Sequence, residues 1–138
     1  MTRVPMGITA HQGPGLPFGS RMLERYSQGL VPQGLSAEMI AEKWGISRRE
    51  LDEVSLESHR RASRATAEGR FEEQIIPVGV TGDDGRVRTI TRDEGIREDT
   101  SLEKLAALQA AFKADGVSTA GNSSQISDGA AAVLVMSE

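Results

Sequence analysis

The chain has 138 residues, of which 38% are hydrophobic, 26% are charged and only 4% are aromatic, as expected of a globular protein with an aliphatic core. The net charge of −4 gives no electrostatic basis for binding nucleic acid. The sequence contains no cysteine, which excludes disulfides, thiolate metal sites and a cysteine nucleophile among these residues.

The first part of the chain predicts a loop followed by two short helices. Residues 1–20 are rich in Gly and Pro, which interrupt regular structure. The first helix is predicted to use Ser20 as its N-cap and Gly29 as its stop. The second is predicted to begin at the cap Ser36 and to end at Gly45, because glycine readily adopts the left-handed conformation that ends a helix.

A third, longer helix has clear signals at both ends. Ser47 and Glu50 have the spacing of a capping box, in which each side chain binds a free backbone N–H of the first turn. Gly69 is the predicted stop. Small and apolar residues recur at steps of three and four, and the predicted apolar face comprises Leu51, Val54, Ser58, Ala62 and Ala65.

The middle of the chain predicts a hairpin and another helix. Residues 74–91 contain two β-rich runs on either side of the turn TGDDGR. Thr100 and Glu103 have capping-box spacing and predict the start of a helix that continues to Phe112, with leucines on its apolar side.

The end of the chain joins a polar turn to an apolar run. Residues 130–136, AAAVLVM, are apolar at every position, which is typical of a strand buried on both faces of a sheet. A short buried helix is the alternative. Because the only other strand region is a charged hairpin, we expect this strand to belong to a larger fold of which the chain is one piece.

Three segments carry a family resemblance. They are residues 34–78, residues 93–116 and residues 118–137, with the sequences GLSAEMIAEKWGISRRELDEVSLESHRRASRATAEGRFEEQIIPV, DEGIREDTSLEKLAALQAAFKADG and STAGNSSQISDGAAAVLVMS. In this order they resemble the thiolase family, which comprises acetyl-CoA acetyltransferases and 3-ketoacyl-CoA thiolases. The resemblance covers essentially the whole chain, and SSQISDGAAAVL is more similar to the degradative 3-ketoacyl class.

The resemblance implies an α/β, thiolase-like fragment. Thiolases have two similar halves in a five-layered αβαβα sandwich, with a mostly helical loop domain inserted in the first half. Residues 1–20 would be an irregular entry from the N-terminal half. Residues 21–117 would form the loop domain with its small hairpin. Residues 118–138 would form the coenzyme A-binding turn and one strand of the core sheet.

The resemblance also implies the chemistry. Thiolases transfer acyl groups between coenzyme A and a 3-ketoacyl-CoA or acetyl-CoA by a ping-pong mechanism, using a cysteine nucleophile and a second cysteine and a histidine for proton transfer. The family motifs that carry these residues are not in this chain. We therefore expect no catalytic residue, no metal ligand and no prosthetic group here, with coenzyme A as a substrate, and we expect the chain alone to be inactive.

Four residues are implied contacts of coenzyme A. Arg97 would lie beside the adenosine phosphates, where a guanidinium suits phosphate oxygens. Phe112 would pack near the adenine or the pantetheine arm, Ala120 would line that arm with its backbone, and Ser124 would hydrogen-bond it. Lys104 departs from the family pattern, because some members have a coenzyme-contacting serine at this position.

Other polar residues receive structural predictions. Asn122 and Asp128 are expected to hold the turn, since such side chains bind backbone groups. His59 is predicted to be a partly exposed helix residue and His11 to lack a catalytic partner. The basic run RRASR, residues 60–64, predicts a solvated helix face that could lie near the coenzyme phosphates.

The leading hypothesis is a thiolase segment that binds coenzyme A and shapes the substrate site. The alternatives are a non-catalytic module that binds coenzyme A thioesters or docks with a subunit, and a relic without function. The expected partners are acyl-CoA and either further copies of the chain or a complementary thiolase segment. With no signal core and no membrane-spanning run, we expect a cytoplasmic protein without membrane partners.

Overall fold

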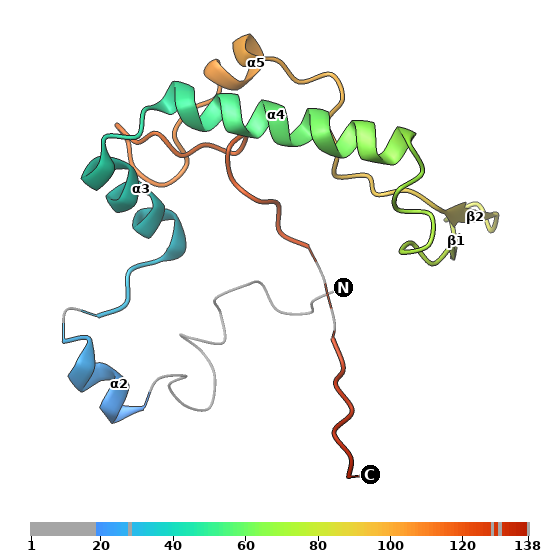
Figure 1. Ribbon diagram of the computed structural model, residues 1–138, viewed down its shortest axis with the longest axis horizontal. Coiled ribbons are helices and arrows are strands. Elements are labelled where there is room, and N and C mark those ends of the chain that lie inside the picture. The colour runs from blue at the N-terminus through green and yellow to red at the C-terminus, as the bar shows by residue number, and fades with distance from the viewer. Residues whose placement is uncertain (1–18, 28, 128, 130, 138) are drawn as a thin grey trace. The chain divides into compact units, whose positions relative to one another are not determined.

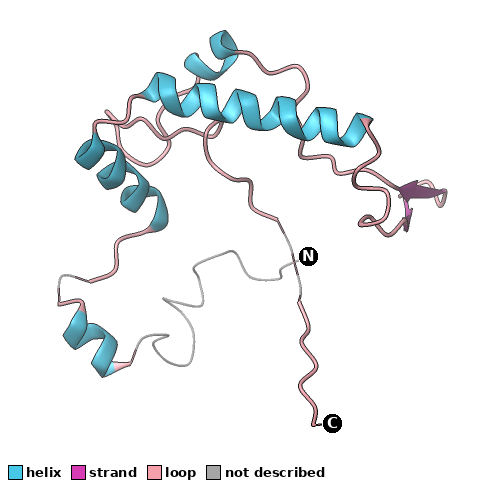
Figure 2. Ribbon diagram, in the orientation of Figure 1, coloured by secondary structure: helices cyan, strands magenta, loops and turns pink. Residues whose placement is uncertain are grey.

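The computed structural model describes residues 19–27, 29–127, 129 and 131–137. Most of the predicted N-terminal loop, with His11, and the predicted turn residue Asp128 lie outside these residues. Helices and loops form most of the described chain (Figure 2), together with one two-stranded sheet. The elements, labelled in Figure 1, are α2 (Ser20–Arg25), α3 (Gln33–Trp44), α4 (Arg48–Ala67), β1 (Val78–Thr81), β2 (Val87–Ile90) and α5 (Leu102–Ala106).

The chain divides into two units. One comprises residues Gln33–Gln125, and the other comprises Met1–Pro32 with Ile126–Glu138. In the second unit, α2 starts one residue away from the prediction. Gly19 occupies the N-cap without a side-chain hydrogen bond, so the predicted cap Ser20 is the first residue of the helix, which ends four residues before Gly29.

Helix α3 ends as predicted but begins earlier. Its first residue is Gln33, so the predicted cap Ser36 lies inside the helix. At the other end Gly45 has a φ of +63°, and the N–H of Ile46 donates to the carbonyl of Ala41 at 2.9 Å. This hydrogen bond is characteristic of a glycine-terminated helix and confirms the predicted stop.

Helix α4 confirms the predicted capping box. The N–H of Ser47 donates to Glu50 Oε2 at 2.7 Å, and the N–H of Glu50 donates to Ser47 Oγ at 3.3 Å. At the other end Gly69 has a φ of +71°, and the N–H of Arg70 donates to the carbonyl of Ala65 at 3.0 Å. The predicted boundaries of this helix are therefore correct.

The buried face of α4 differs from the prediction. Val54, a predicted core position, is 71% exposed, and Ser58 is also exposed. The buried residues are Asp52 and Leu56. The predicted face was wrong because Asp52, a charged residue, occupies one of the buried positions, and a prediction from apolar periodicity considers only apolar residues.

The predicted hairpin is confirmed. Strands β1 and β2 are antiparallel, with Val78 opposite Ile90 and Thr81 opposite Val87. The N–H of Gly82 donates to the carbonyl of Arg86 at 2.9 Å and closes the turn.

Helix α5 lies beside α4 (Figure 1) and is shorter than predicted. Its N-cap is Ser101, whose hydroxyl accepts from the N–H of Lys104 at 3.3 Å, and not Thr100. It ends at Ala106, before Phe112. The Arg48 guanidinium donates from Nη2 to the carbonyls of Leu105 at 2.5 Å and of Leu108 at 3.0 Å. These contacts satisfy carbonyl groups at the helix end, which a longer helix would use internally.

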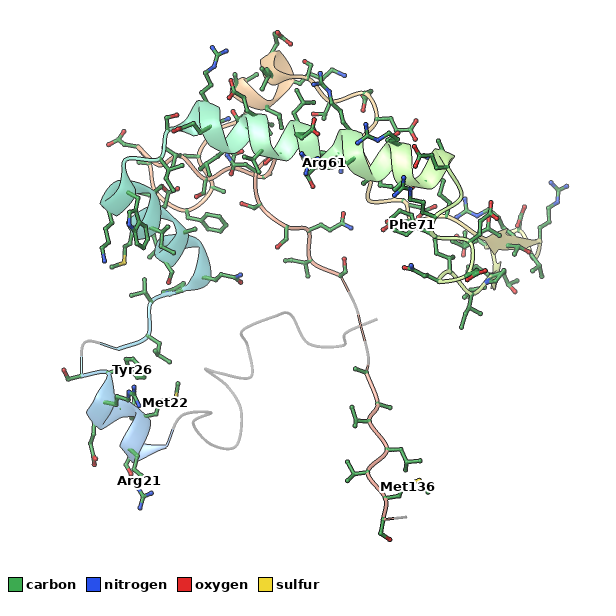
Figure 3. All side chains as sticks on the ribbon, viewed as in Figure 1. Arg21, Met22, Tyr26, Arg61, Phe71 and Met136 are labelled. Atoms are coloured by element: carbon green, nitrogen blue, oxygen red, sulfur yellow. The ribbon has the colours of Figure 1, made fainter. Side chains whose placement is uncertain are left out.

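The apolar run at the C-terminal end was predicted to form a strand over residues 130–136. Residue 130 lies outside the described residues, and residues 131–136 do not form a strand. Its side chains are between 77% and 88% exposed from Val133 to Met136, and Met136 projects away from the trace (Figure 3). A strand requires a partner for its backbone groups. Within the described residues the two strands pair with each other, and no other strand is available.

The interior of the unit Gln33–Gln125 is unusually polar. Its buried apolar side chains within the described residues are Ala41, Leu56 and Leu105. The residues buried with them are Glu38, Asp52, Ser118 and Thr119. The two carboxylates therefore carry much of the packing that hydrophobic side chains would otherwise supply.

Glu38 is 3% exposed and joins α3 to the segment after residue 116. Its carboxylate accepts from the N–H of Val117 at 2.9 Å and from the N–H of Ser118 at 2.8 Å. Burial alone raises the pKa of Glu38. The hydrogen bonds from Val117 and Ser118, with the positive charge of Lys113, outweigh burial and hold the pKa below its ordinary value of 4.5.

We expect Glu38→Gln to lower the free energy of unfolding of the chain at pH 7 by about 1.5–3 kcal/mol, the range for hydrogen bonds to a charged group. The lowered pKa means that the unfolded chain binds more protons near pH 4. The contribution of Glu38 is therefore fully present above its ordinary pKa and is lost as the pH falls through the folded value. Urea unfolding of both proteins should show a difference in the free energy of unfolding that is largest at pH 7 and narrows as the pH is lowered below 4.5.

The matched control is Glu42→Gln, on the same helix. Glu42 forms an exposed ion pair with Lys113, and we expect its substitution to cost less than about 1 kcal/mol. An equal cost for both variants, or a difference for Glu38→Gln that does not change with pH, would contradict the assignment.

Candidate functional site

A groove of about 790 Å³ lies in the unit Gln33–Gln125, between α4, residues 95–100, α5 and residues 120–125. Its lining combines three kinds of side chain. The cations are Arg97 and Lys104, serine hydroxyls come from both α4 and the final turn, and the apolar part is formed by Val54, Leu105 and Leu108. The groove therefore suits a ligand with an apolar arm and anionic groups.

The turn at one wall of the groove is held by Asn122. Its Oδ1 accepts from the N–H of Thr119 at 2.7 Å, and its Nδ2 donates to the carbonyl of Val117 at 2.9 Å. The same Nδ2 donates to Asp52 Oδ1 at 3.1 Å, and Asp52 also accepts from Arg48 Nε at 2.8 Å. The prediction that Asn122 holds the turn is confirmed, and the buried Asp52 fixes that turn to α4.

Glycine is required where the turn approaches the leucines at α5. A Cβ atom on Gly121 would lie 2.5 Å from Leu105 Cδ2 and 2.6 Å from Leu108 Cδ1. Contacts this short do not occur between non-bonded carbon atoms, so a side chain here would push the turn or the leucines away. The missing side chain lets the backbone of the turn lie directly against the apolar part of the groove.

The opposite wall is attached to α4 through a histidine. The backbone N–H of Arg97 donates to His59 Nδ1 at 3.1 Å. This Nδ1 accepts a hydrogen bond, so the ring proton of a neutral His59 is on Nε2. His59 thus fixes the backbone of the residue that supplies a guanidinium to the groove.

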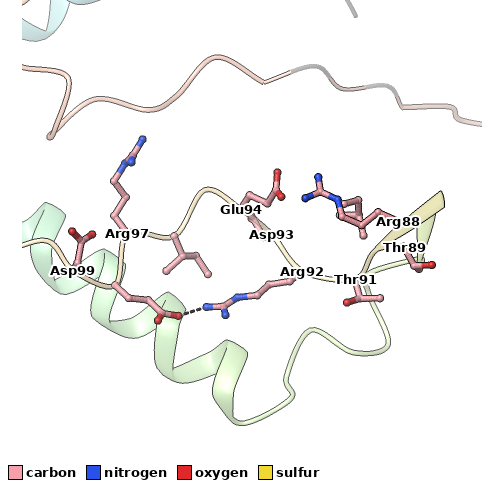
Figure 4. A pocket seen from close by; sticks show the side chains of 11 residues that line it. Arg88, Thr89, Thr91, Arg92, Asp93, Glu94, Arg97 and Asp99 are labelled. Atoms are coloured by element: carbon pink, nitrogen blue, oxygen red, sulfur yellow. Dashed lines mark hydrogen bonds and ion pairs between the residues drawn. The ribbon is translucent and has the colours of Figure 1, made fainter. Parts of the chain in front are cut away.

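Ion pairs organise the rest of this wall. Lys104 Nζ donates to Asp99 Oδ2 at 2.8 Å and to the Asp99 carbonyl at 2.6 Å, and the hydrogen bond from Lys104 lowers the pKa of the Asp99 carboxyl. Figure 4 shows the ion pair between Arg92 and Glu98 in a neighbouring hollow, with the side chain of Arg97 leaving the segment on the opposite side from that pair. The Arg97 guanidinium forms no ion pair with any residue that the structure describes.

Three of the four residues expected to contact coenzyme A line this one groove. They are Arg97, Ala120 and Ser124. Phe112 does not line it. Its ring packs over the backbone of Gly34 in α3, where a Cβ would lie 2.2 Å from a ring carbon, and it is 47% exposed.

Sequence reasoning missed the structural roles of three residues. His59 was expected only to be a partly exposed helix residue, which it is, but it also holds Arg97. Glu38 and Asp52 were not singled out. For Asp52 a signal exists in the sequence, because Arg48 precedes it by four residues, which is the spacing of an ion pair on a helix.

The described part of the chain contains neither a metal-binding cluster nor a membrane-spanning helix. No group of three or more His, Asp or Glu residues there could hold a metal ion. No helix there has the length and apolar character needed to cross a membrane.

Comparisons with known proteins give a consistent result. The family model for the thiolase N-terminal domain matches residues 1–138. The chain is 48% identical to the human peroxisomal 3-ketoacyl-CoA thiolase over 136 residues, which cover 94% of the chain and 32% of the relative. It is 50% identical to a probable acetyl-CoA acyltransferase of Staphylococcus aureus (strain COL), over 76% of the chain and 27% of the relative.

Solved structures agree with these sequence matches. The crystal structure of the Bacillus anthracis acetyl-CoA acetyltransferase matches with a TM-score of 0.64 and 40% identity, over 68% of the chain and 24% of that protein. The human mitochondrial 3-ketoacyl-CoA thiolase matches with a TM-score of 0.61 and 36% identity, over 69% and 23%. The predicted fold class is confirmed, and the chain spans about a third of the length of the curated relatives it matches.

We expect His59→Ala to loosen residues 95–100. Loss of one hydrogen bond of about 0.5–1.5 kcal/mol should speed hydrogen exchange of the Arg97 amide by roughly 2- to 10-fold, measured by NMR. Ser58→Ala, at the adjacent exposed position of α4, is the control and should leave the exchange rate unchanged. An unchanged rate in His59→Ala would show that His59 does not hold this segment.

Proposed function

The chain belongs to the thiolase family, and we propose that it forms the coenzyme A-binding part of an acyltransferase that acts on coenzyme A thioesters. The relatives are named acyltransferases and thiolases, which supports this class of reaction. The observation that carries the proposal is the groove, in which Arg97, Ala120 and Ser124 come together from two separate segments.

The character of the groove matches the parts of coenzyme A. The pantetheine arm is largely apolar but carries amides, which fits Val54 and Leu108 beside the hydroxyl of Ser124. The adenosine end carries phosphates, which fit the Arg97 guanidinium. Lys104 lines the groove with its ammonium bound to Asp99, so it would reach a phosphate only by leaving that carboxylate.

In the proposed reaction, a cysteine outside these residues accepts the acyl group as a thioester and passes it on in a second step. The residues of this chain bind and orient the coenzyme and do not take part in bond making. Positioning alone is a large part of catalysis when two reactants must meet in one geometry.

The exposed apolar run Val133–Met136 supports a partner for the chain. Four consecutive apolar side chains that are at least 77% exposed favour burial against another polypeptide. We propose a complementary thiolase segment or a second copy of the chain as that partner. The same observation favours the second candidate function, a subunit-docking module without catalysis.

The proposal predicts that the chain binds coenzyme A in isothermal titration calorimetry. Arg97→Ala should weaken binding by about 10-fold or more, as expected for a charge-assisted contact, and Ser124→Ala by roughly 2- to 10-fold. Arg49→Ala is the control, because Arg49 lies on α4 in an exposed ion pair with Glu53, away from the groove. No heat of binding at millimolar coenzyme A would reject the proposal.

We expect the 138-residue chain alone to show no cleavage of acetoacetyl-CoA in the presence of coenzyme A, because it contains no cysteine to accept the acyl group. The loss of the acetoacetyl-CoA enolate absorbance measures this reaction. Turnover above the uncatalysed rate by the purified chain would show that acyl transfer here does not need a cysteine.

A further inference from the structure

A further cavity, of about 290 Å³ and different from the one drawn in Figure 4, adjoins the groove and is called the hollow below. It lies between α4 and residues 97–100, and the two cavities share His59, Arg97 and Thr100 in their walls. At 790 Å³ the groove is in the range of about 300–1,000 Å³ that small-molecule sites occupy, whereas the hollow falls just below it. The hollow is therefore suited to one group of a ligand whose remainder occupies the groove.

The wall of the hollow is rich in arginine. Arg60, Arg64 and Arg97 line it, with hydroxyls from Ser63 and Thr100. None of these three arginines forms an ion pair with another residue in the described part of the chain. Arg60 and Arg64 are four residues apart on α4, a spacing at which two like charges repel each other. An anion between them would relieve that repulsion.

Nearby acidic residues are already engaged. Glu98 also lines the hollow, but its carboxylate accepts from Arg92. Glu57 accepts from Arg61 Nε at 2.7 Å, and this hydrogen bond is the main cause of its lowered pKa, with smaller contributions from the charges of Arg64 and Arg60. The positive charge of Arg60 and Arg64 thus remains available to a ligand.

Taken with the proposed function, on which this inference rests, we propose that the hollow binds the terminal phosphate of coenzyme A. This group is the phosphate monoester on the 3′ oxygen of the ribose, a dianion at neutral pH. Arg60 and Arg64 are then ligand-binding residues in addition to Arg97. The pantetheine arm extends from the shared wall into the groove, toward Ser124.

The run RRASR contains its own control. Arg61 lies on α4 (Figure 3), between Arg60 and Arg64 in the sequence, but it does not line the hollow and is paired with Glu57. Arg61→Ala combined with Glu57→Gln therefore removes the same positive charge from the same helix without freeing a carboxylate to compete for Arg60 and Arg64.

The test is calorimetry of the full chain with coenzyme A, 3′-dephospho-coenzyme A and inorganic phosphate. We expect coenzyme A to bind about 10-fold more tightly than its dephospho form, from charge-assisted hydrogen bonds to the phosphate. In the Arg60→Ala/Arg64→Ala variant this advantage should disappear while the affinity for 3′-dephospho-coenzyme A is retained. The control variant Arg61→Ala/Glu57→Gln should behave as the wild type. Weak binding of inorganic phosphate should also be lost only in the double variant.

Equal affinity for coenzyme A and its dephospho form in the wild type would overturn the phosphate site while leaving the proposed function standing. A double variant that weakens both ligands alike would overturn the phosphate site in the same way. Binding of neither ligand to the wild type would reject both proposals. Urea unfolding checks that each variant is folded. Arg60→Lys/Arg64→Lys, which keeps the charge, should retain part of the preference for coenzyme A, and its failure to do so in a folded protein would count against the site.

Discussion

Two buried carboxylates determine how the candidate site of this chain is built. Glu38 accepts from the backbone N–H groups of Val117 and Ser118, which lead into the turn at residues 120–125. Asp52 accepts from the side-chain amide of Asn122 inside that turn. Burying a charge is costly unless it is fully hydrogen-bonded. Both carboxylates meet that condition, and within the described residues no buried side-chain polar atom lacks a partner. Beside three buried apolar side chains in the described residues, this network positions the turn that forms one wall of the groove.

Arg48 extends the same network to the other side of the groove. It donates to Asp52 and to the carbonyls of Leu105 and Leu108. One side chain therefore connects the first turn of α4, the buried carboxylate and the C-terminal end of α5. The leucines at that end also contact the backbone at Gly121. The walls are therefore joined through shared partners, and a change at one is transmitted to the others.

The parts that sequence predicted well are those governed by neighbours along the chain. The Ser47 capping box, the stops at Gly45 and Gly69 and the hairpin follow from local backbone chemistry. The errors arise where distant residues decide. Helix α5 stops at Ala106, where Arg48 binds the carbonyls of Leu105 and Leu108. The carboxylate of Asp52 occupies a buried position of α4 that apolar periodicity does not predict. The apolar C-terminal run forms no strand without partner strands. For the site, the family resemblance identified three residues of one groove, but the contact between His59 and the backbone of Arg97 leaves no pattern in the sequence.

The spacing of the network along the chain has a consequence for the order of folding. The two amides that Glu38 binds are 79 and 80 residues away from it in sequence, and Asp52 and Asn122 are 70 residues apart. Helix α4 contains its own start and stop signals and can form as soon as it is synthesised. Closing a loop of some 80 residues costs conformational entropy before any contact is gained. The groove is thus a feature of high contact order, which forms after the local helices that build its walls.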